Sequence, residues 1–415
     1  MSAALDVAAV FRDGESSFIA RYGHTLRSEQ PQALRAVIRC RTAELGGHVQ
    51  RCETCSHQRI QYNSCRNRHC PKCQALARAA WLQKRESELL PVPYFHVVFT
   101  LPHELAPLAL QNPRVVYGIL FQAAARTLVE VAADHRHLGA RVGCLMVLHT
   151  WGQNLMHHPH VHSIVTGGGL SPDGSRWIYG KRSKRRRPFF APVKVLSRVF
   201  RGKFIRLLKQ AFASGKLAFH GQLQPLRDPA GFEQRLNHAV RHDWVVYAKR
   251  PFSSPTCVLK YLARYTHGVA LSNRRLVALH NGQVSFRYKD YADHQQSKIL
   301  TLQTPEFIRR FLLHTLPRSF VRIRYYGFLA NRQRNKRLEH CRRLLGLKHE
   351  PRETTPEKAP PAEAADPQVT CHRCPVCQRG KLVIIEVVPP VSRLQLRRPH
   401  ILTSRAAFAL PLDSS

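Results

Sequence analysis

Acidic residues are scarce in this sequence. Its 415 residues include 26 Asp and Glu against 65 Lys and Arg, so the formal net charge is +39 at pH 7. Such a surface favours a polyanionic partner, because binding to nucleic acid releases condensed counterions. Charge alone leaves open a ribosomal or chromatin-type binding protein, and it makes anionic lipid the weaker alternative.

Three other features are missing. No apolar run approaches the ~20 residues of a membrane span, so we expect no membrane segment. Residues 1–10 lack the basic and apolar stretches of a signal peptide, which predicts a cytoplasmic, nucleoid-associated protein. No G-x-x-x-x-G-K-[ST] loop is present, which argues against nucleotide hydrolysis. In a reducing cytosol, the 12 cysteines favour metal sites over disulfides.

The pattern of apolar residues and prolines divides the chain into four parts. Residues 1–90 are predicted to form a helical and zinc-binding N-terminal domain. Residues 91–348 alternate strands with helices, with strands expected over 95–101, 142–151 and 160–166, which predicts an α+β sheet domain. Residues 349–370 contain five prolines and no apolar period, as in a flexible linker, and residues 371–415 form a short tail.

Two Cys-x₂-Cys pairs lie within the first part. Cys52 and Cys55 precede Cys70 and Cys73 by a spacing typical of zinc sites, so these four are the predicted ligands of a structural Zn²⁺. Nearby residues leave open a replaced ligand or a second site: Cys65, His48, His57 and His69. The module is basic, so we expect it to contact DNA as well as to act as a structural clip, through Arg66 and Arg68.

A further cysteine group lies in the tail. Cys371, Cys374 and Cys377 resemble a zinc knuckle with His372 beside them, but they offer only three thiols. An unstructured tail is the alternative interpretation.

The segment His157–His162 contains a histidine–valine–histidine pattern. On a strand over 160–166, His160 and His162 point to one face, where two imidazoles form half of a divalent-metal site. If residues 155–158 form the turn, Gln153 lies opposite His160 and is the predicted third ligand. His149, which would face Ile164, is the reserve. A chance pair in a sequence with 24 histidines is the alternative.

A predicted helix over 255–266 carries two tyrosines. Tyr261 and Tyr265 are four residues apart and therefore share a face, while Lys260 and Arg264 form a basic pair suited to phosphates. Packing of both tyrosines against the sheet is the alternative. A basic loop over 181–187 is expected to contact the DNA backbone, unless it is only a solvated turn; its central residues are Lys184, Arg185 and Arg186.

Six motifs together resemble rolling-circle transposases of the insertion sequence 91 family, which are HUH nucleases, over about residues 30–346. The six motifs are Ser64-Cys-Arg-Asn-Arg-His-Cys-Pro-Lys-Cys-Gln74, Phe99-Thr-Leu-Pro102, Leu148-His-Thr-Trp-Gly-Gln-Asn-Leu155, Lys260-Tyr-Leu-Ala-Arg-Tyr-Thr-His267, Phe286-Arg-Tyr-Lys-Asp290 and Tyr326-Gly-Phe-Leu-Ala-Asn331. Two departures are Gly268, where relatives tend to carry a basic residue, and the extension after residue 349.

The resemblance implies a zinc-binding N-terminal domain and an HUH catalytic domain with a ferredoxin-like (RRM-like) antiparallel sheet. It also implies cleavage and rejoining of single-stranded DNA at transposon ends and target DNA. Tyr261 and Tyr265 would be the nucleophiles, forming 5′-phosphotyrosine with Mg²⁺ or Mn²⁺. The chain shows no helicase of its own, so a host helicase is the expected partner.

Three other interpretations compete with a transposase. A replication initiator or relaxase would use the same chemistry at another DNA origin, and the paired Cys-x₂-Cys motifs argue against it. A zinc-containing DNA-binding regulator would need no cleavage, and the HxH strand with two tyrosines argues against that. An inactive remnant is the third, although all the required chemical residues are present.

Overall fold

The computed structural model describes residues 5–86, 88–180, 191–249, 252, 257–258, 261, 270–291, 293–347 and 373–391. They fall into two compact units: the larger contains 5–38 and 66–347, and the smaller contains 39–65 and 373–391. The expected boundary at residue 90 is therefore not where the units divide. The expected linker, residues 349–370, lies outside the described residues.

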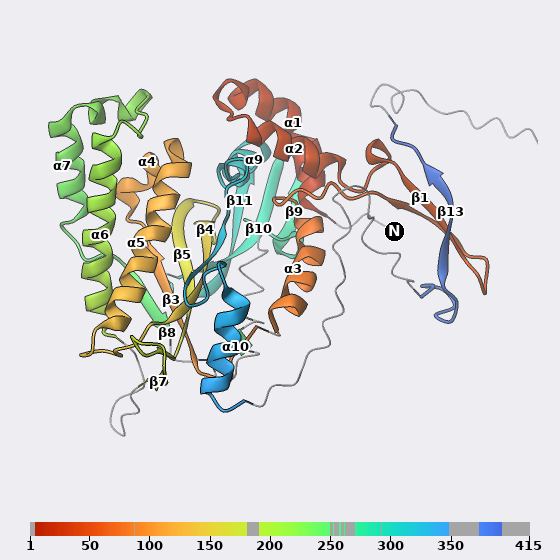
Figure 1. Cartoon of the computed structure of the whole chain (residues 1–415). Coiled ribbons are helices and arrows are strands. Elements are labelled where there is room, and N and C mark those ends of the chain that lie inside the picture. The colour runs from red at the N-terminus through yellow and green to blue at the C-terminus, as the bar shows by residue number, and fades with distance from the viewer. Residues whose placement is uncertain are drawn as a thin grey trace, which may run out of the picture. The chain divides into compact units, whose positions relative to one another are not determined.

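A five-stranded antiparallel sheet forms the centre of the larger unit, in the order β12-β4-β5-β3-β8 (Figure 1). The strands are β3 (Tyr94–Thr100), β4 (Gly143–Trp151), β5 (His157–Thr166), β8 (Val246–Lys249) and β12 (Ile323–Gly327). The three expected strands over 95–101, 142–151 and 160–166 are thus its three inner strands. This confirms the predicted α+β class with an antiparallel sheet.

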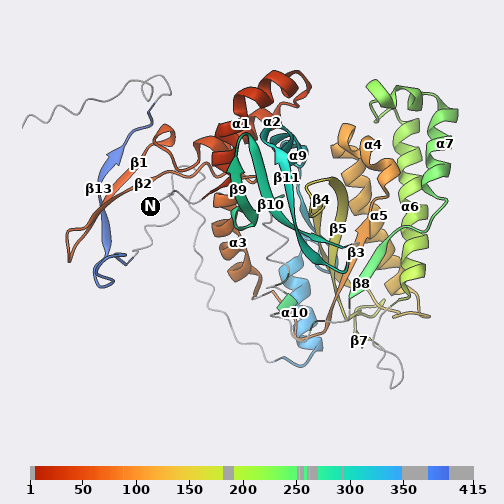
Figure 2. The same ribbon diagram turned by 180° about the vertical axis from the view of Figure 1, so that it is seen from behind.

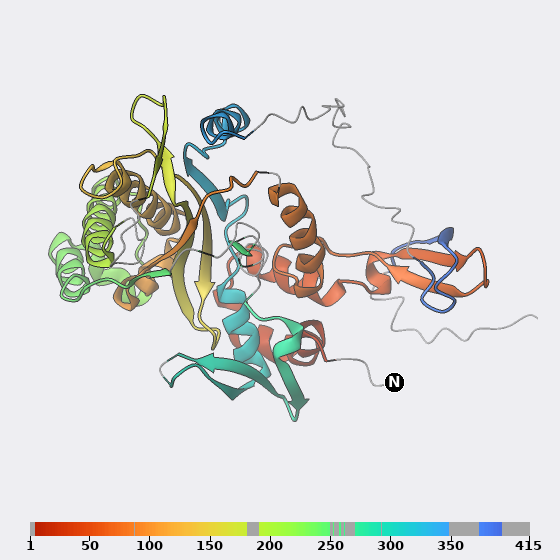
Figure 3. The same cartoon turned by 90° about the horizontal axis from the view of Figure 1, so that it is seen from below.

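Helices cover one face of this sheet (Figure 3). Alternate residues such as Phe99 on β3, Leu148 on β4 and Val161 on β5 are buried in a core shared with them. These helices are α4 (Ala106–Gln111), α5 (Pro113–Ala133), α6 (Val193–Ala213) and α7 (Pro229–Ala239). The intervening residues of the same strands point to the opposite face.

Helix α5 is long and apolar enough to cross a membrane by length and composition alone. We expected no such run. However, 67% of its most apolar window is buried, and it packs on the sheet with Leu120, Phe121 and Leu128 fully inside the core. These are the properties of a central core helix.

The opposite face of the sheet has a smaller apolar cluster near one end. It joins Leu145 and Val147 of β4 and Ile164 of β5 to Leu338 of α10 (Arg334–Leu344). The strands β6 (Gly168–Leu170) and β7 (Trp177–Tyr179) pair beside it.

A second layer of the larger unit contains the N-terminal helices and a three-stranded sheet (Figure 2). Phe11 of α1 packs edge-on against Phe311 of α9, with ring centroids 5.2 Å apart. The elements are α1 (Val7–Tyr22), α2 (Glu29–Arg39), α3 (Pro71–Glu86), β9 (Leu276–His280), β10 (Gln283–Asp290), β11 (Gln296–Gln303) and α9 (Thr304–Leu313).

The smaller unit is a three-stranded antiparallel sheet in the order β13-β1-β2. β1 (Gly47–Cys52) is central, between β2 (Gln58–Tyr62) and β13 (Leu382–Val388). Its pairing with β13 extends from Gly47 opposite Val388 to Cys52 opposite Leu382. Residues 373–391 of the expected tail are therefore part of the same sheet as the first Cys-x₂-Cys pair.

Candidate metal centre and nucleophile

Three histidines meet on the face of the central sheet opposite α5 and α6. His160 and His162 belong to β5, and His149 of β4 lies directly opposite His160. Their ring nitrogens lie within 4.8 Å of one another, which is close enough to bind one metal ion. The predicted pair is therefore brought together with a third imidazole.

The expected position of Gln153 is wrong. The pairing register places His149, not Gln153, opposite His160, and it shifts between His149 and Trp151. The chain turns earlier than expected: the N–H of Gly152 donates to the carbonyl of Met156 at 2.9 Å. Gln153 thus lies in the turn, where its carbonyl accepts a hydrogen bond from Arg275.

The cluster is largely buried, with His149 4% and His162 7% exposed. Burial, with smaller contributions from neighbouring imidazoles, holds the pKa of His162 well below its usual range. Burial also lowers the pKa of His160 to about 4. Both rings are consequently neutral near pH 7, which is the form that binds metals. Nδ1 of His160 donates to the carbonyl of His158 at 2.7 Å, which places the lone pair on Nε2.

A fourth histidine connects this cluster to a tyrosine. His96 of β3 places Nε2 2.9 Å from Nδ1 of His162, and the two rings stack. The hydroxyl of Tyr261 lies 3.4 Å from Nδ1 of His96. The sequence motifs did not single out His96. The signal available was a histidine on the strand beside the HxH strand, in the same alternation.

Several predicted residues lie outside the described residues. They are Tyr265, Lys260, Arg264, Lys184, Arg185 and Arg186. Among those that are described, Arg66 is exposed. Arg68 instead donates to the carbonyls of Leu316, Pro317 and Phe320 at 3.2, 2.8 and 2.7 Å, so its guanidinium holds that segment of the backbone.

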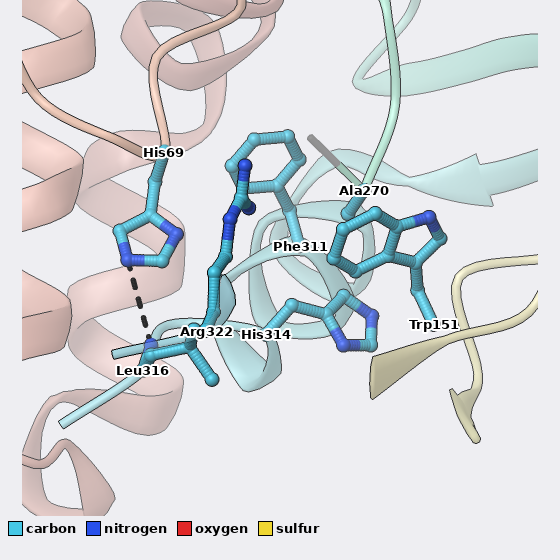
Figure 4. A pocket seen from close by; sticks show the side chains of 7 residues that line it. All are labelled: His69, Trp151, Ala270, Phe311, His314, Leu316 and Arg322. Atoms are coloured by element: carbon cyan, nitrogen blue, oxygen red, sulfur yellow. Dashed lines mark hydrogen bonds between the residues drawn. The ribbon is translucent and has the colours of Figure 1, made fainter. Parts of the chain in front are cut away.

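A small cavity of about 10 Å³ lies beside the histidine cluster, lined by Trp151, His314, His69 and Arg322 among others (Figure 4). Trp151 stacks on His149 with ring centroids 4.5 Å apart. His314 is bonded to Thr150 and to the carbonyl of Leu155, so it ties the β4–β5 turn to the residues after α9. The cavity has room for about one water molecule.

His69, one of the alternative zinc ligands, lines this cavity. Its Nε2 accepts the backbone N–H of Leu316 at 3.4 Å, and burial lowers the pKa of its ring to about 3.

The smaller unit contains a group of four cysteines: Cys52, Cys55, Cys374 and Cys377. All four sulfur atoms lie within 4.8 Å of one another, as a structural Zn²⁺ site requires. The predicted partnership of Cys52 and Cys55 with Cys70 and Cys73 is therefore wrong. The backbone N–H of Gly380 points at Cys377 and is the main reason that its pKa falls to about 6.

Two family models match this chain. Residues 10–101 match a model described as "Transposase zinc-binding domain", and residues 143–337 match one described as "Putative transposase". The three histidines lie within the second match. Cys374 and Cys377 lie beyond both.

Two curated relatives extend these matches over most of the chain. The "Putative transposase y4qJ" of Sinorhizobium fredii (strain NBRC 101917 / NGR234) is 50% identical over 393 residues, which cover 93% of this chain and 96% of the relative. The "Transposase for insertion sequence element IS801" of Pseudomonas savastanoi pv. phaseolicola is 31% identical, over 74% of this chain and 72% of the relative. No solved structure matches the chain. From these relatives and both domain matches, the chain belongs to the transposases of the insertion sequence 91 family.

Proposed function

We propose that this protein cleaves and rejoins single-stranded DNA at the ends of its element through 5′-phosphotyrosine intermediates, and so drives rolling-circle transposition. One observation carries the proposal: the hydroxyl of Tyr261 lies 3.4 Å from His96, which is bonded to His162 of the three-histidine cluster. A nucleophile beside a site for a divalent cation is the arrangement that phosphodiester transfer requires.

The three histidines are the proposed ligands of the catalytic cation, with His149 in place of Gln153. Mn²⁺ suits three nitrogen donors better than Mg²⁺, because Mg²⁺ prefers oxygen ligands and gives up its waters reluctantly. A cation bound there would act as a Lewis acid toward the scissile phosphate.

Tyr261 is the proposed nucleophile for one cut. Its oxygen forms a bond to phosphorus as the bond to the 3′ oxygen breaks, which leaves the 5′ end on the protein and a 3′-OH on the DNA. Tyr265 is proposed to make a second cut while the first end stays attached.

His96 is proposed to position Tyr261 and to stabilise its oxygen. If His162 binds metal through Nε2, its Nδ1 carries a proton and donates to Nε2 of His96. The neutral His96 then has its own proton on Nδ1, facing the Tyr261 hydroxyl. A donor in that place favours negative charge on the tyrosine oxygen as it attacks.

Basic residues are the proposed contacts with the DNA backbone. The smaller unit has an open groove of about 620 Å³, lined by Arg41, Arg59, Arg373 and Tyr62, with Ile60 and Gln61. Guanidinium groups with a neighbouring aromatic ring suit a single strand. The other proposed contacts are Arg66, Lys260, Arg264, Lys184, Arg185 and Arg186. We further propose that the protein acts in the cytoplasm, at the nucleoid, with a host helicase.

The test uses labelled single-stranded oligonucleotides that carry the element's ends, with Mn²⁺, Mg²⁺ or EDTA. The products are separated on a denaturing protein gel. We expect a cation-dependent covalent adduct between the protein and the new 5′ end of the fragment that lies 3′ of the cut. This adduct should be abolished when both Tyr261→Phe and Tyr265→Phe are present. The single variants assign each cut to one tyrosine.

His96→Ala is an additional variant in the same assay, and His158→Ala is its matched control. His158 is adjacent to the cluster: its backbone carbonyl accepts the hydrogen bond from Nδ1 of His160, and its ring lies beside the His160 ring with centroids 5.2 Å apart. We expect adduct formation to slow about 10- to 100-fold for His96→Ala at saturating DNA and cation, and to stay near wild type for His158→Ala. Tight DNA binding without an adduct under every condition would refute the proposed activity.

A further inference from the structure

We propose that Cys52, Cys55, Cys374 and Cys377 bind a single zinc ion, so that the zinc-binding module of this transposase is completed by the C-terminal segment of its own chain. The matched zinc-binding domain covers residues 10–101, and this site takes half of its ligands from far outside that range. The inference does not depend on the proposed cleavage chemistry.

The spacing of the sulfur atoms fits a tetrahedral zinc site. Cys52 and Cys377 place their Sγ atoms 3.7 Å apart, and Cys55 and Cys374 place theirs 3.6 Å apart. Zn–S bonds of about 2.3 Å in a tetrahedron separate the sulfurs by about 3.8 Å. A disulfide needs about 2.05 Å, so neither pair is arranged as one.

Backbone N–H groups point at the sulfurs of both knuckles. Thr54 and Cys55 direct their N–H groups at Sγ of Cys52, at 3.4 and 3.5 Å. Gly380 directs its own at Sγ of Cys377, at 3.4 Å. Such donors stabilise thiolates, which are the form that binds zinc. Each knuckle thus directs backbone N–H groups at a cysteine sulfur, although more than 300 residues separate the two in the sequence.

The backbone at the second knuckle is fitted closely to the first. A Cβ at Gly380 would lie 2.5 Å from Oγ1 of Thr54 and closer still to Cys52, so glycine is required there. The N–H of Glu53 donates to the carbonyl of Lys381 at 3.1 Å, which continues the pairing of β1 with β13 up to the site. Two of the four cysteines, Cys52 and Cys374, are buried together with Leu382 of β13.

The smaller unit has little apolar core with which to stabilise its fold without a metal. The buried apolar cluster at this site has three members, of which Cys52 and Cys374 are themselves proposed ligands and Leu382 is the third. Small domains with so little apolar core often need metal to fold. The zinc therefore holds β13 to β1, and it also fixes Arg373, which precedes Cys374 and lines the basic groove.

The experiment counts zinc in the purified full-length chain by mass spectrometry. Three variants are compared with the wild type: Cys52→Ser with Cys55→Ser, Cys374→Ser with Cys377→Ser, and all four together. Each double variant is expected to lose one zinc per chain, and the quadruple variant is expected to lose no more than one. Cys257→Ser, at an exposed cysteine outside the group, is the matched control and should keep every zinc.

Two outcomes would overturn the proposal. If the Cys374→Ser, Cys377→Ser variant kept all its zinc, the C-terminal knuckle would not be a ligand pair. If the quadruple variant lost two zinc ions while each double variant lost one, the knuckles would belong to separate sites. Substitution of cobalt for zinc gives a second readout in folded protein, because its sulfur-to-metal absorption should fall in both double variants alike.

Discussion

At the scale of single residues, the site depends on which side chain lies opposite His160. His149 and Gln153 are four residues apart in the sequence, yet one lies on β4 within the cluster and the other in the turn. Both occur in the same family motif, so the motif alone does not distinguish them. The pairing of β4 with β5 does, because paired residues share a face of the sheet.

This difference predicts opposite outcomes for two neighbouring variants. His149→Ala should lower cation-dependent cleavage by about 100-fold or more and weaken Mn²⁺ binding, since losing even a supporting contact to a metal ligand costs about 10- to 100-fold. Gln153→Ala should stay within about threefold of the wild type, because only its backbone carbonyl is used. Titration of cleavage rate against Mn²⁺ concentration measures both. A larger defect for Gln153→Ala would restore Gln153 as the ligand.

At the scale of elements, β12 supports the strand that carries His149. It is an edge strand whose residues pair with β4, from Ile323 opposite Val147 to Gly327 opposite Gly143. Gly327 has a φ of +64° and lies against the backbone of Val142, where an added Cβ would come 3.4 Å from the Cα of Gly143 and closer to the Val142 carbonyl. The end of this strand therefore tolerates only glycine.

Gly327→Ala should lower the free energy of unfolding by about 2–4 kcal/mol, from left-handed strain together with a steric clash. Gly346→Ala is the matched control, because Gly346 has a φ of +72° but no neighbour within 4 Å. It should cost only the backbone strain, about 1–2 kcal/mol. Urea denaturation followed by circular dichroism measures both losses. Equal losses would show that the contact with β4 is not tight.

Local patterns predicted the elements better than they predicted the partners of those elements. Short apolar segments identified the three strands β3, β4 and β5, and the HxH pair identified the face that carries the site. The predicted register of β4 against β5 was wrong because it was counted from a turn at 155–158. The chain instead turns at 152–156, and the pairing shifts between His149 and Trp151. The predicted set of zinc ligands was wrong for a related reason. Sequence spacing favoured the nearest Cys-x₂-Cys pair, whereas the pairing of β1 with β13 brings Cys374 and Cys377 beside Cys52 and Cys55.

At the scale of the whole molecule, the net charge of +39 makes ionic strength the main control of DNA binding. A charge of this size attracts any polyanion over a long range, so specificity has to come from particular contacts. Arginines that line a groove differ in this respect from arginines already paired with an acid. Arg136, for example, is bonded to Asp134 at 2.7 Å.

We therefore predict a change in the salt dependence of binding. Replacing Arg41, Arg59 and Arg373 together with Ala should reduce the slope of log K against log salt concentration by about 2, since each phosphate contact to a single strand contributes about 0.7. Arg136→Ala should leave the slope unchanged. Fluorescence anisotropy with a labelled oligonucleotide over a salt series measures it. An unchanged slope in the triple variant would remove the groove from the DNA path.

The pairing of β1 with β13 also sets an order for biosynthesis. β1 leaves the ribosome early, but its partner β13 follows only after the whole central sheet has been translated. The three-stranded sheet is thus among the last parts of the molecule to assemble. An element that has lost the 3′ end of its gene would still encode the histidines and Tyr261, but its product would lack β13. Such a gene would make a protein with its central sheet intact and its smaller unit without one strand.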